Sequence, residues 1–237
     1  MTPPASSPAR PSTLPADGVR IRIWDLPTRL FHWLLAAAVT GVLVTGWTGV
    51  MDWHFRLGYA VLALLLFRLV WGFVGGRWSR FAAFVHGPRA VAADLRGQAH
   101  PDHLIGHSPL GSLSVFAMLG ILILQVVTGL VSDDAITYAG PLAHTVSGAL
   151  SGLATNWHAE WGKWVVIGLI ALHLAALLYY AAVRRHRLVA PMITGDKVFP
   201  PDTAIAPSRD VAGSRWLALA LFAGCVAVVG WISSIRP

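Results

Sequence analysis

The sequence predicts an all-α transmembrane fold, a four-helix bundle followed by a fifth transmembrane helix at the C-terminus. Of its 237 residues, 55% are hydrophobic and only 12% are charged, whereas soluble domains average about 25% charged residues. The apolar residues fall in blocks of about 20, the length that crosses a bilayer core as a helix. The blocks lack the ten-residue alternation of a membrane β-barrel, and only helices or closed barrels satisfy backbone polar groups in lipid.

Five candidate spans can be placed on the chain. The first four lie close together and predict the bundle, while the fifth follows a Pro-rich linker, has no ionisable residue in its interior and is expected to lie outside the working core. Their ranges are 30–50, 57–76, 109–131, 162–183 and 215–235.

The spans divide the chain into four parts. The N-terminal segment is rich in Pro, Ser and Ala and has no apolar stretch of the signal-peptide type, so it predicts a disordered cytoplasmic tail. The predicted parts are the tail at 1–20, the bundle domain at 21–197, the linker at 198–214 and the fifth helix at 215–237.

The basic residues predict how the chain is oriented in a bacterial inner membrane. The tail and the loops after the second and fourth spans carry 14 Lys and Arg residues, against three on the other side. Because cytoplasmic loops are enriched in Lys and Arg, we expect a cytoplasmic N-terminus and a periplasmic C-terminus. The three basic residues on the periplasmic side are Arg56, Lys163 and Arg236.

Composition also excludes several classes of function. The formal net charge of +7 does not indicate nucleic-acid binding, because the basic residues lie between apolar blocks that contact membrane lipid. Cys225 is the only cysteine and lies in an apolar block. The chain therefore has no disulfide, no cysteine ligand set for an iron–sulfur cluster and no motif for covalent heme attachment.

Four of the ten histidines lie at the ends of predicted membrane spans or inside one, where a polar ring is unusual. His32 lies at the start of the first span, His54 just before the second, His158 just before the fourth and His173 inside the fourth. An ionisable side chain inside a membrane is costly, so each is a candidate functional residue.

Helix geometry arranges these histidines in pairs. His173 follows His158 by 15 residues, about 22 Å along a helix, so the depths predict His32 opposite His173 and His54 opposite His158. Each pair could hold one heme iron from both sides, with the two hemes stacked across the membrane. His158 and His173 lie about 60° apart around an ideal helix, and local unwinding near His158 could absorb the difference. No carboxylate or thiolate at either depth favours a zinc or non-heme iron site.

Two further residues follow a histidine by 14 positions. Gly46 follows His32 and could let the periplasmic heme approach the backbone. Arg68 follows His54 and lies inside the second span, where a propionate of the cytoplasmic heme could neutralise it; the alternative is that Arg68 snorkels to the headgroups.

Several stretches of the chain resemble the bacterial cytochrome b561 family, which includes the b-type subunits of nickel–iron hydrogenases and is similar to the gamma subunits of formate dehydrogenases. The resemblance covers about 20–197 and implies a four-helix bundle with two hemes b, whose ligands match His32, His54, His158 and His173. The segments that carry it are RLFHW, WHFRLGYAVLALLLFRLVWGFVG, GHSPLG, NWHAEWGKWVVIGLIALH and APMITGDK.

The resemblance also implies a quinone site near the cytoplasmic heme, at the start of the third helix. Ser108 stands there, where members of the family often have Asn, so its shorter hydroxyl would reach less far toward quinone. The same residues can be interpreted as a capped helix start, with Ser108 at the N-cap and Pro109 at the first helical position.

Iron with two axial histidines has no open coordination position and transfers single electrons. The sequence therefore predicts a membrane subunit that moves electrons between quinone and a periplasmic redox partner, which could be a hydrogenase-like or dehydrogenase complex or a cytochrome c. One alternative is a stand-alone superoxide:ubiquinone oxidoreductase, for which Arg56 and Lys163 could form a basic funnel. The other is a heme-free membrane anchor.

Overall fold

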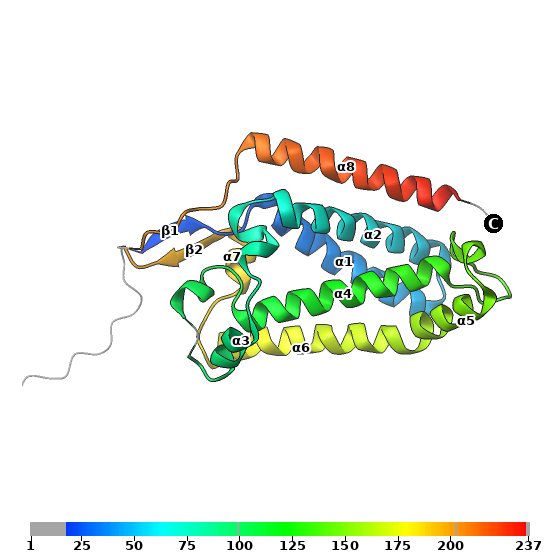
Figure 1. Cartoon of the computed structure of the whole chain (residues 1–237), viewed down its shortest axis with the longest axis horizontal. Coiled ribbons are helices and arrows are strands. Elements are labelled where there is room, and N and C mark those ends of the chain that lie inside the picture. The colour runs from blue at the N-terminus through cyan, green and yellow to red at the C-terminus, as the bar shows by residue number, and fades with distance from the viewer. Residues whose placement is uncertain (1–17, 99, 202, 236–237) are drawn as a thin grey trace, which may run out of the picture.

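The computed structural model describes residues 18–98, 100–201 and 203–235. The predicted tail therefore lies outside the described residues up to position 17. Within the described residues, five helices are long and apolar enough to cross a membrane, which confirms the predicted all-α fold (Figure 1). The long helices are α1 (Leu26–Thr48), α2 (Met51–Val74), α4 (Pro109–Val131), α6 (Lys163–Ala182) and α8 (Ala212–Ser234).

Short elements connect the long helices. Helix α1 ends at Gly49, whose φ of 73° is left-handed and favours glycine, and α2 begins two residues later. This tight turn makes α1 and α2 antiparallel neighbours. The remaining short elements are η1 (Arg77–Ser79), η2 (Phe81–Ala83), α3 (Pro88–Leu95), η3 (Pro101–Leu104), η4 (Ala143–Thr145) and α7 (Val189–Thr194).

The fourth span begins earlier than its apolar run. Helix α5 (Gly148–Asn156) continues through a π-helical segment, η5 (Trp157–Gly162), directly into α6. His158 therefore lies inside a continuous helical segment. A π turn is wider than an α turn, so each residue advances by less than 100° and the offset between His158 and His173 is reduced. The local unwinding expected near His158 is thus present.

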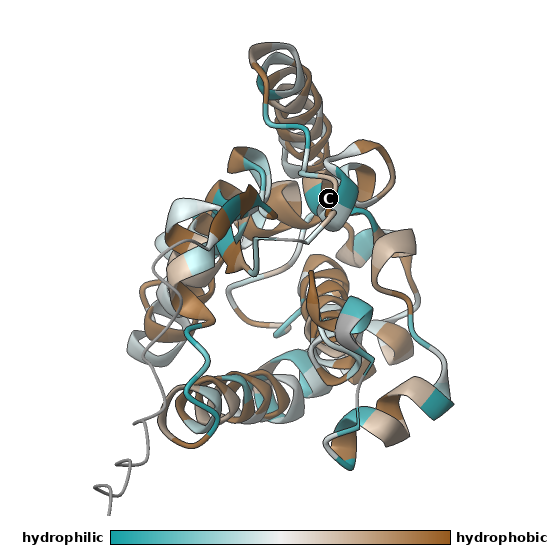
Figure 2. Ribbon diagram, turned by 90° about the vertical axis from the view of Figure 1, so that its left-hand side faces the viewer, coloured by the Kyte–Doolittle hydropathy of each residue, from teal (hydrophilic) through white to brown (hydrophobic). Residues whose placement is uncertain are grey.

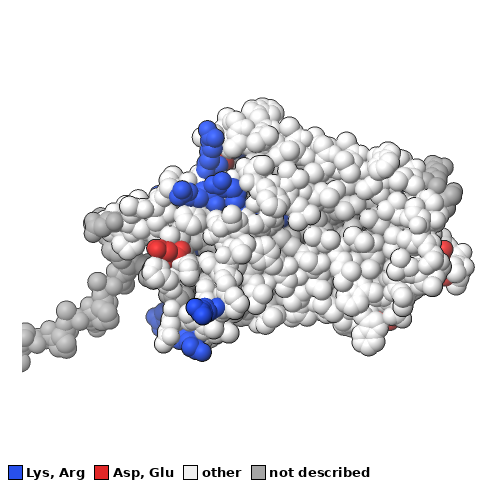
Figure 3. All heavy atoms as spheres, in the orientation of Figure 1, with Lys and Arg blue, Asp and Glu red and all other residues white. Residues whose placement is uncertain are grey.

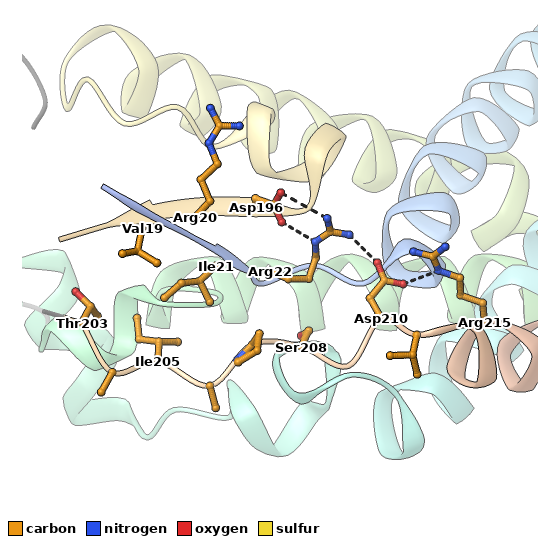
Figure 4. A pocket seen from close by; sticks show the side chains of 14 residues that line it. Val19, Arg20, Ile21, Arg22, Asp196, Thr203, Ile205, Ser208, Asp210 and Arg215 are labelled. Carbon is orange, nitrogen blue, oxygen red and sulfur yellow. Dashed lines mark hydrogen bonds and ion pairs between the residues drawn. The ribbon is translucent and has the colours of Figure 1, made fainter. Parts of the chain in front are cut away.

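A two-stranded sheet at one end of the bundle was not expected from the sequence. Strand β1 (Val19–Arg22) pairs antiparallel with β2 (Asp196–Phe199), with Arg22 opposite Asp196. The Arg22 guanidinium binds Asp196 at 2.6 Å and Asp210 at 2.7 Å, and Asp210 also binds Arg215 at the start of α8 (Figure 4). These ion pairs tie the fifth helix to the sheet.

Helix α2 is the centre of the packing. It contacts α1, α4 and α8, and α4 in turn contacts α6. Helix α8 lies outside the bundle (Figure 2), where Phe222 meets Phe67 of α2 edge to face at 5.9 Å between ring centroids. The fifth helix is therefore peripheral, as its sequence indicated.

The two ends of the bundle differ in composition. The sheet end comprises β1, β2, the first turns of α1 and α4 and the last turns of α2 and α6; the loop end comprises the turn between α1 and α2, the segment 132–147 and η5. Lys and Arg gather at the sheet end of the face shown in Figure 3, whereas Asp and Glu appear at both of its ends. Large apolar side chains stay exposed between the ends, for example Leu172 and Leu178 of α6, as expected where lipid is the solvent.

Candidate functional site

His54 and His158 face one another at the loop end. Their ring centroids are 5.9 Å apart and their planes are inclined by 86°. Two imidazole nitrogens that share one metal at about 2 Å each would place the ring centroids about 6 Å apart. The separation therefore fits a metal held between the two rings.

The backbone fixes which nitrogen of each ring is free. His54 Nδ1 lies 3.0 Å from the carbonyl oxygen of Val42, and His158 Nδ1 lies 2.8 Å from that of Gln125. A carbonyl oxygen only accepts hydrogen bonds, so each Nδ1 carries the proton and each Nε2 keeps a lone pair for a metal.

Gln125 holds His158 a second time, because its side-chain Nε2 donates to the carbonyl oxygen of His158 at 2.8 Å. Sequence reasoning missed this residue. The available signal was an amide in the middle of an apolar span, where a polar side chain needs a partner.

Two glycines make room for the loop-end rings. A Cβ on Gly46 would lie 3.1 Å from His54 Nδ1, and a Cβ on Gly129 would lie 2.7 Å from His158 Cε1. Gly46 thus stands at the loop end, as its position in the first span predicted, and lies against the His54 ring. Gly129 was missed, because nothing in the sequence distinguishes it from other glycines of the third span.

His32 and His173 lie toward the sheet end, on α1 and α6. They are about 9 Å and 14 Å from the sheet-end termini of their helices, and their rings are within electrostatic range of one another. The Nδ1 atom of His32 is buried and has no hydrogen-bond partner among the described residues. The structure therefore brings these two histidines toward the same end of the bundle, with the buried Nδ1 of His32 without a partner among the described residues.

Arg68 is buried at the same end, with only 3% of its surface exposed. Its guanidinium carbon lies 4.6 Å from the centroid of the Phe81 ring and 5.9 Å from that of Phe84. Within the described part of the chain, Nη1 finds no hydrogen-bond partner. Arg68 therefore stays inside the protein rather than reaching the headgroups, and its unpartnered nitrogen suits an anionic group such as a propionate.

A buried carboxylate lies close to Arg68. Asp25 caps α1 by accepting from the amide of Thr28 at 2.8 Å, and it also accepts from Trp71 Nε1 at 3.2 Å and Ser79 Oγ at 2.5 Å. The sequence Asp25-Leu26-Pro27 could have indicated the cap, but not the partners that lie some 50 residues away in the chain.

Ser108 caps α4, and its Oγ accepts from the amide of Gly111 at 3.1 Å. The interpretation of this segment as a capped helix start is thus confirmed, while quinone contact stays a prediction. The neighbouring His107 ring lies between Trp24 and Phe84, with centroids at 4.6 Å and 4.5 Å. Sequence reasoning did not single out this histidine.

Each histidine pair could supply two ligands. In the parts of the chain that the structure describes, no group of three or more His, Cys, Asp or Glu side chains is placed to bind a metal ion. Two axial imidazoles suit an iron whose other four ligands come from a porphyrin.

A multi-pass helical bundle with two histidine pairs at different depths has the architecture of a membrane b-type cytochrome. The chain belongs to the prokaryotic cytochrome b561 family, whose model matches residues 23–195. This confirms the resemblance found in the sequence and defines the protein as a heme-containing membrane cytochrome of electron transport.

Similar proteins are known from several bacteria. A probable Ni/Fe-hydrogenase B-type cytochrome subunit of Bradyrhizobium diazoefficiens is 23% identical over 214 residues, covering 76% of this chain and 86% of the relative. The protein of the same name from Rhodobacter capsulatus is 23% identical over 217 residues, covering 77% and 83%. A probable Ni/Fe-hydrogenase 1 B-type cytochrome subunit of Escherichia coli K12 is 24% identical over 210 residues, covering 73% and 88%.

Proposed function

We propose that this cytochrome holds two hemes b and transfers electrons across the bacterial inner membrane between quinone and a periplasmic redox partner. The observation that carries the proposal is the His54–His158 pair, whose rings are 5.9 Å apart and whose Nδ1 atoms are both engaged by backbone carbonyls. Such a pair is already arranged to hold an iron through its two Nε2 atoms.

The residues present fit two hemes at different depths. His54 and His158 would hold the loop-end heme, with Gly46 close by, and His32 and His173 would hold the sheet-end heme, whose propionate Arg68 would neutralise. When bound, each heme supplies one-electron transfer at an iron without an open coordination position. The protein fixes the imidazoles and excludes water from the space between the helices.

Charge supports an orientation with the sheet end in the cytoplasm. The 14 basic residues predicted to be cytoplasmic belong to the tail and to the loops at this end, against three at the other. In this orientation the loop-end heme faces the periplasm, and the sheet-end heme lies near Ser108 and the proposed quinone site. A reporter fused after Arg187 should then be cytoplasmic, and one inserted near Asp134 periplasmic.

The relatives favour a hydrogenase-like catalytic complex as the periplasmic partner, because each is named as a cytochrome subunit of a Ni/Fe-hydrogenase. A stand-alone reaction with superoxide is less well supported, since it calls for free cations at the loop end. Arg56 lies over the Trp53 ring at 5.5 Å, and Lys163 is 3.9 Å from the Glu160 carboxylate.

The experiment is a heme assay combined with a quinol reaction. Purified protein should contain two non-covalent hemes per chain in a pyridine hemochrome assay, and a short-chain ubiquinol should reduce the heme in an anaerobic stopped-flow measurement. One heme per chain would reject the two-pair arrangement, and a heme that no quinol reduces and no quinone oxidises would reject quinone as the redox partner.

A further inference from the structure

We propose that four histidines, His100, His103, His86 and His107, form a proton path from water at the sheet end to the quinone site at the start of α4. The inference rests on the proposed function, because it assumes that quinone reacts at this end of the bundle. It assigns a role to histidines that neither heme uses.

The four side chains follow one another from the surface inward. The His100 side chain is 66% exposed, and its ring centroid lies 5.9 Å from that of His103. The His103 and His86 rings are 4.6 Å apart, and His86 Nε2 lies 3.4 Å from the backbone carbonyl oxygen of His107. A carbonyl oxygen accepts a hydrogen bond but passes no proton on, so a water bound between the His86 and His107 rings would carry the last step. The two connecting segments before and after α3 therefore bring their histidines together in one line.

The inner end of the line is half-buried. The His107 ring is packed between Trp24 and Phe84, and its Nδ1 is buried without a hydrogen-bond partner among the described residues. A buried ring nitrogen normally has a partner, so this atom is available to a group that binds beside it. Ser108, the predicted quinone contact, is the next residue in the chain.

The charges around His107 suit transfer of a proton rather than its storage. The titratable groups within electrostatic range are Arg68 of α2, Lys197 of β2, His32 of α1 and His86. A further positive charge near Arg68 and Lys197 is unfavourable, so a proton that reaches this ring would be passed on. The carboxylate of Asp94 in α3 is engaged as the acceptor of the Leu110 amide at 3.0 Å.

The chemistry of quinone requires such a path. Reduction of one quinone to quinol consumes two electrons, which arrive singly through the heme, and two protons, which bind the two carbonyl oxygens and come from water. The reverse reaction returns two protons along the same line. Histidine is the side chain that gains and loses a proton most readily near neutral pH, and the aromatic rings around His107 hinder direct access of water.

The test uses the full-length, heme-loaded protein in nanodiscs, with ubiquinol as the reductant in stopped flow. His103→Ala and His86→Ala should slow heme reduction by quinol at least about tenfold, since a positioned proton carrier contributes roughly 10²–10⁴ in rate. Reduction by dithionite, the heme spectrum and both midpoint potentials should stay unchanged, because no proton path is needed for them. Added imidazole should restore part of the rate in His103→Ala.

His186→Ala is the matched control, because His186 is exposed beyond the sheet-end terminus of α6 and lies outside the line. Its quinol rate should equal that of the wild type. If His103→Ala and His86→Ala react with quinol as fast as His186→Ala, the path is rejected while the proposed function stands. If the wild-type heme does not react with quinol at all, the proposed function is rejected and the path with it.

Discussion

The two histidine pairs are held in different ways. At the loop end, both rings donate from Nδ1 to backbone carbonyls, and Gly46 and Gly129 leave space that a methyl group would fill. At the sheet end, the buried Nδ1 of His32 has no partner in the described chain, and the same holds for Arg68 Nη1 and His107 Nδ1. Buried polar atoms without a partner among the described residues also occur at the loop end, on Gln125 Oε1 and Trp157 Nε1. The two ends therefore differ in that the backbone orients both rings of the loop-end pair, and in that a buried cation, Arg68, lies at the sheet end.

This difference indicates a division of roles. Electron transfer alone needs fixed ligands and little else, which is what the loop end offers. The proposed quinone chemistry would also need protons and a place for an anionic or polar group, for which the buried Arg68 and the histidines of the sheet end are suited. Helix α8 takes part in neither pair, since it packs on the outer side of α2.

Removing single histidine ligands should have the largest effect, because each variant should lose the heme at one end of the bundle and keep the other. His54→Ala and His158→Ala should each delete the loop-end heme, and His32→Ala and His173→Ala the sheet-end heme, so that heme content falls from two per chain to one. Pyridine hemochrome gives the count, and redox titration identifies the missing component.

His144→Ala serves as the control for the ligand variants, because this histidine is exposed at the loop end and belongs to neither pair. It should retain both hemes. If His32→Ala and His54→Ala removed the same redox component, the pairing by depth would be wrong.

The glycine beside His158 should give the next largest effect. In Gly129→Ala the new Cβ would lie 2.7 Å from His158 Cε1, so the ring must move or the helices must separate. Overpacking of this kind costs about 1–3 kcal/mol, which should weaken binding of the loop-end heme by roughly ten- to a hundredfold and leave the sheet-end heme in place. Heme titration of the apoprotein measures both sites.

Gly120→Ala is the matched control in the same helix, because no atom outside the helix backbone lies within 4 Å of the position that its new methyl group would occupy. Equal heme affinity in the two variants would show that the space beside His158 is not needed.

Replacing Arg68 should change the redox potential of the heme at one end only. Replacing it by Leu removes a buried cation from the sheet end, so the oxidised heme there, which carries the extra positive charge, becomes easier to form. The midpoint potential of that heme should fall by tens of millivolts, and that of the loop-end heme should change much less. Arg68→Lys should shift it less than Arg68→Leu. Equal shifts in both hemes, or none, would reject the propionate contact in potentiometric titration.

The helices and the depth of each histidine could be predicted because both follow from local properties of the chain. Apolar length locates a span, and the rise per residue places His32, His54, His158 and His173 along it. The fourth span was predicted to start at 162, which is too late, because apolar content marks only the part of a helix that faces lipid. The helical backbone begins at Gly148, where Ser147 Oγ accepts from the amide of Leu150 at 3.3 Å.

What could not be predicted depends on contacts between distant segments. Arg22 and Asp196 are 174 positions apart, and no local pattern shows that they share a sheet. The same applies to Gln125 and Gly129, whose importance comes from the position of the His158 ring on another helix. The local sequence around Asp25 indicates a helix cap, but the hydrogen bond from Ser79 to Asp25 forms only in the folded chain.

The smallest expected effect concerns the two lysines, one at each end of the bundle. At the sheet end, Lys197 Nζ donates to the carbonyl oxygens of Leu104 and Ile105 at 2.8 Å and 3.0 Å, and burial lowers the pKa of Lys197 from 10.5 to about 8. The folded protein therefore binds fewer protons than the unfolded chain between about pH 8 and 10.5, so the free energy of unfolding should rise with pH in that window and be lowest below it. Thermal unfolding from pH 7.5 to 9.5 should show this rise in the wild type and in Lys163→Met, which changes the exposed lysine of the loop end, but not in Lys197→Met. The same pH dependence in all three proteins would mean that the charge on Lys197 is not penalised by folding, and that the sheet end carries less buried charge than its geometry indicates.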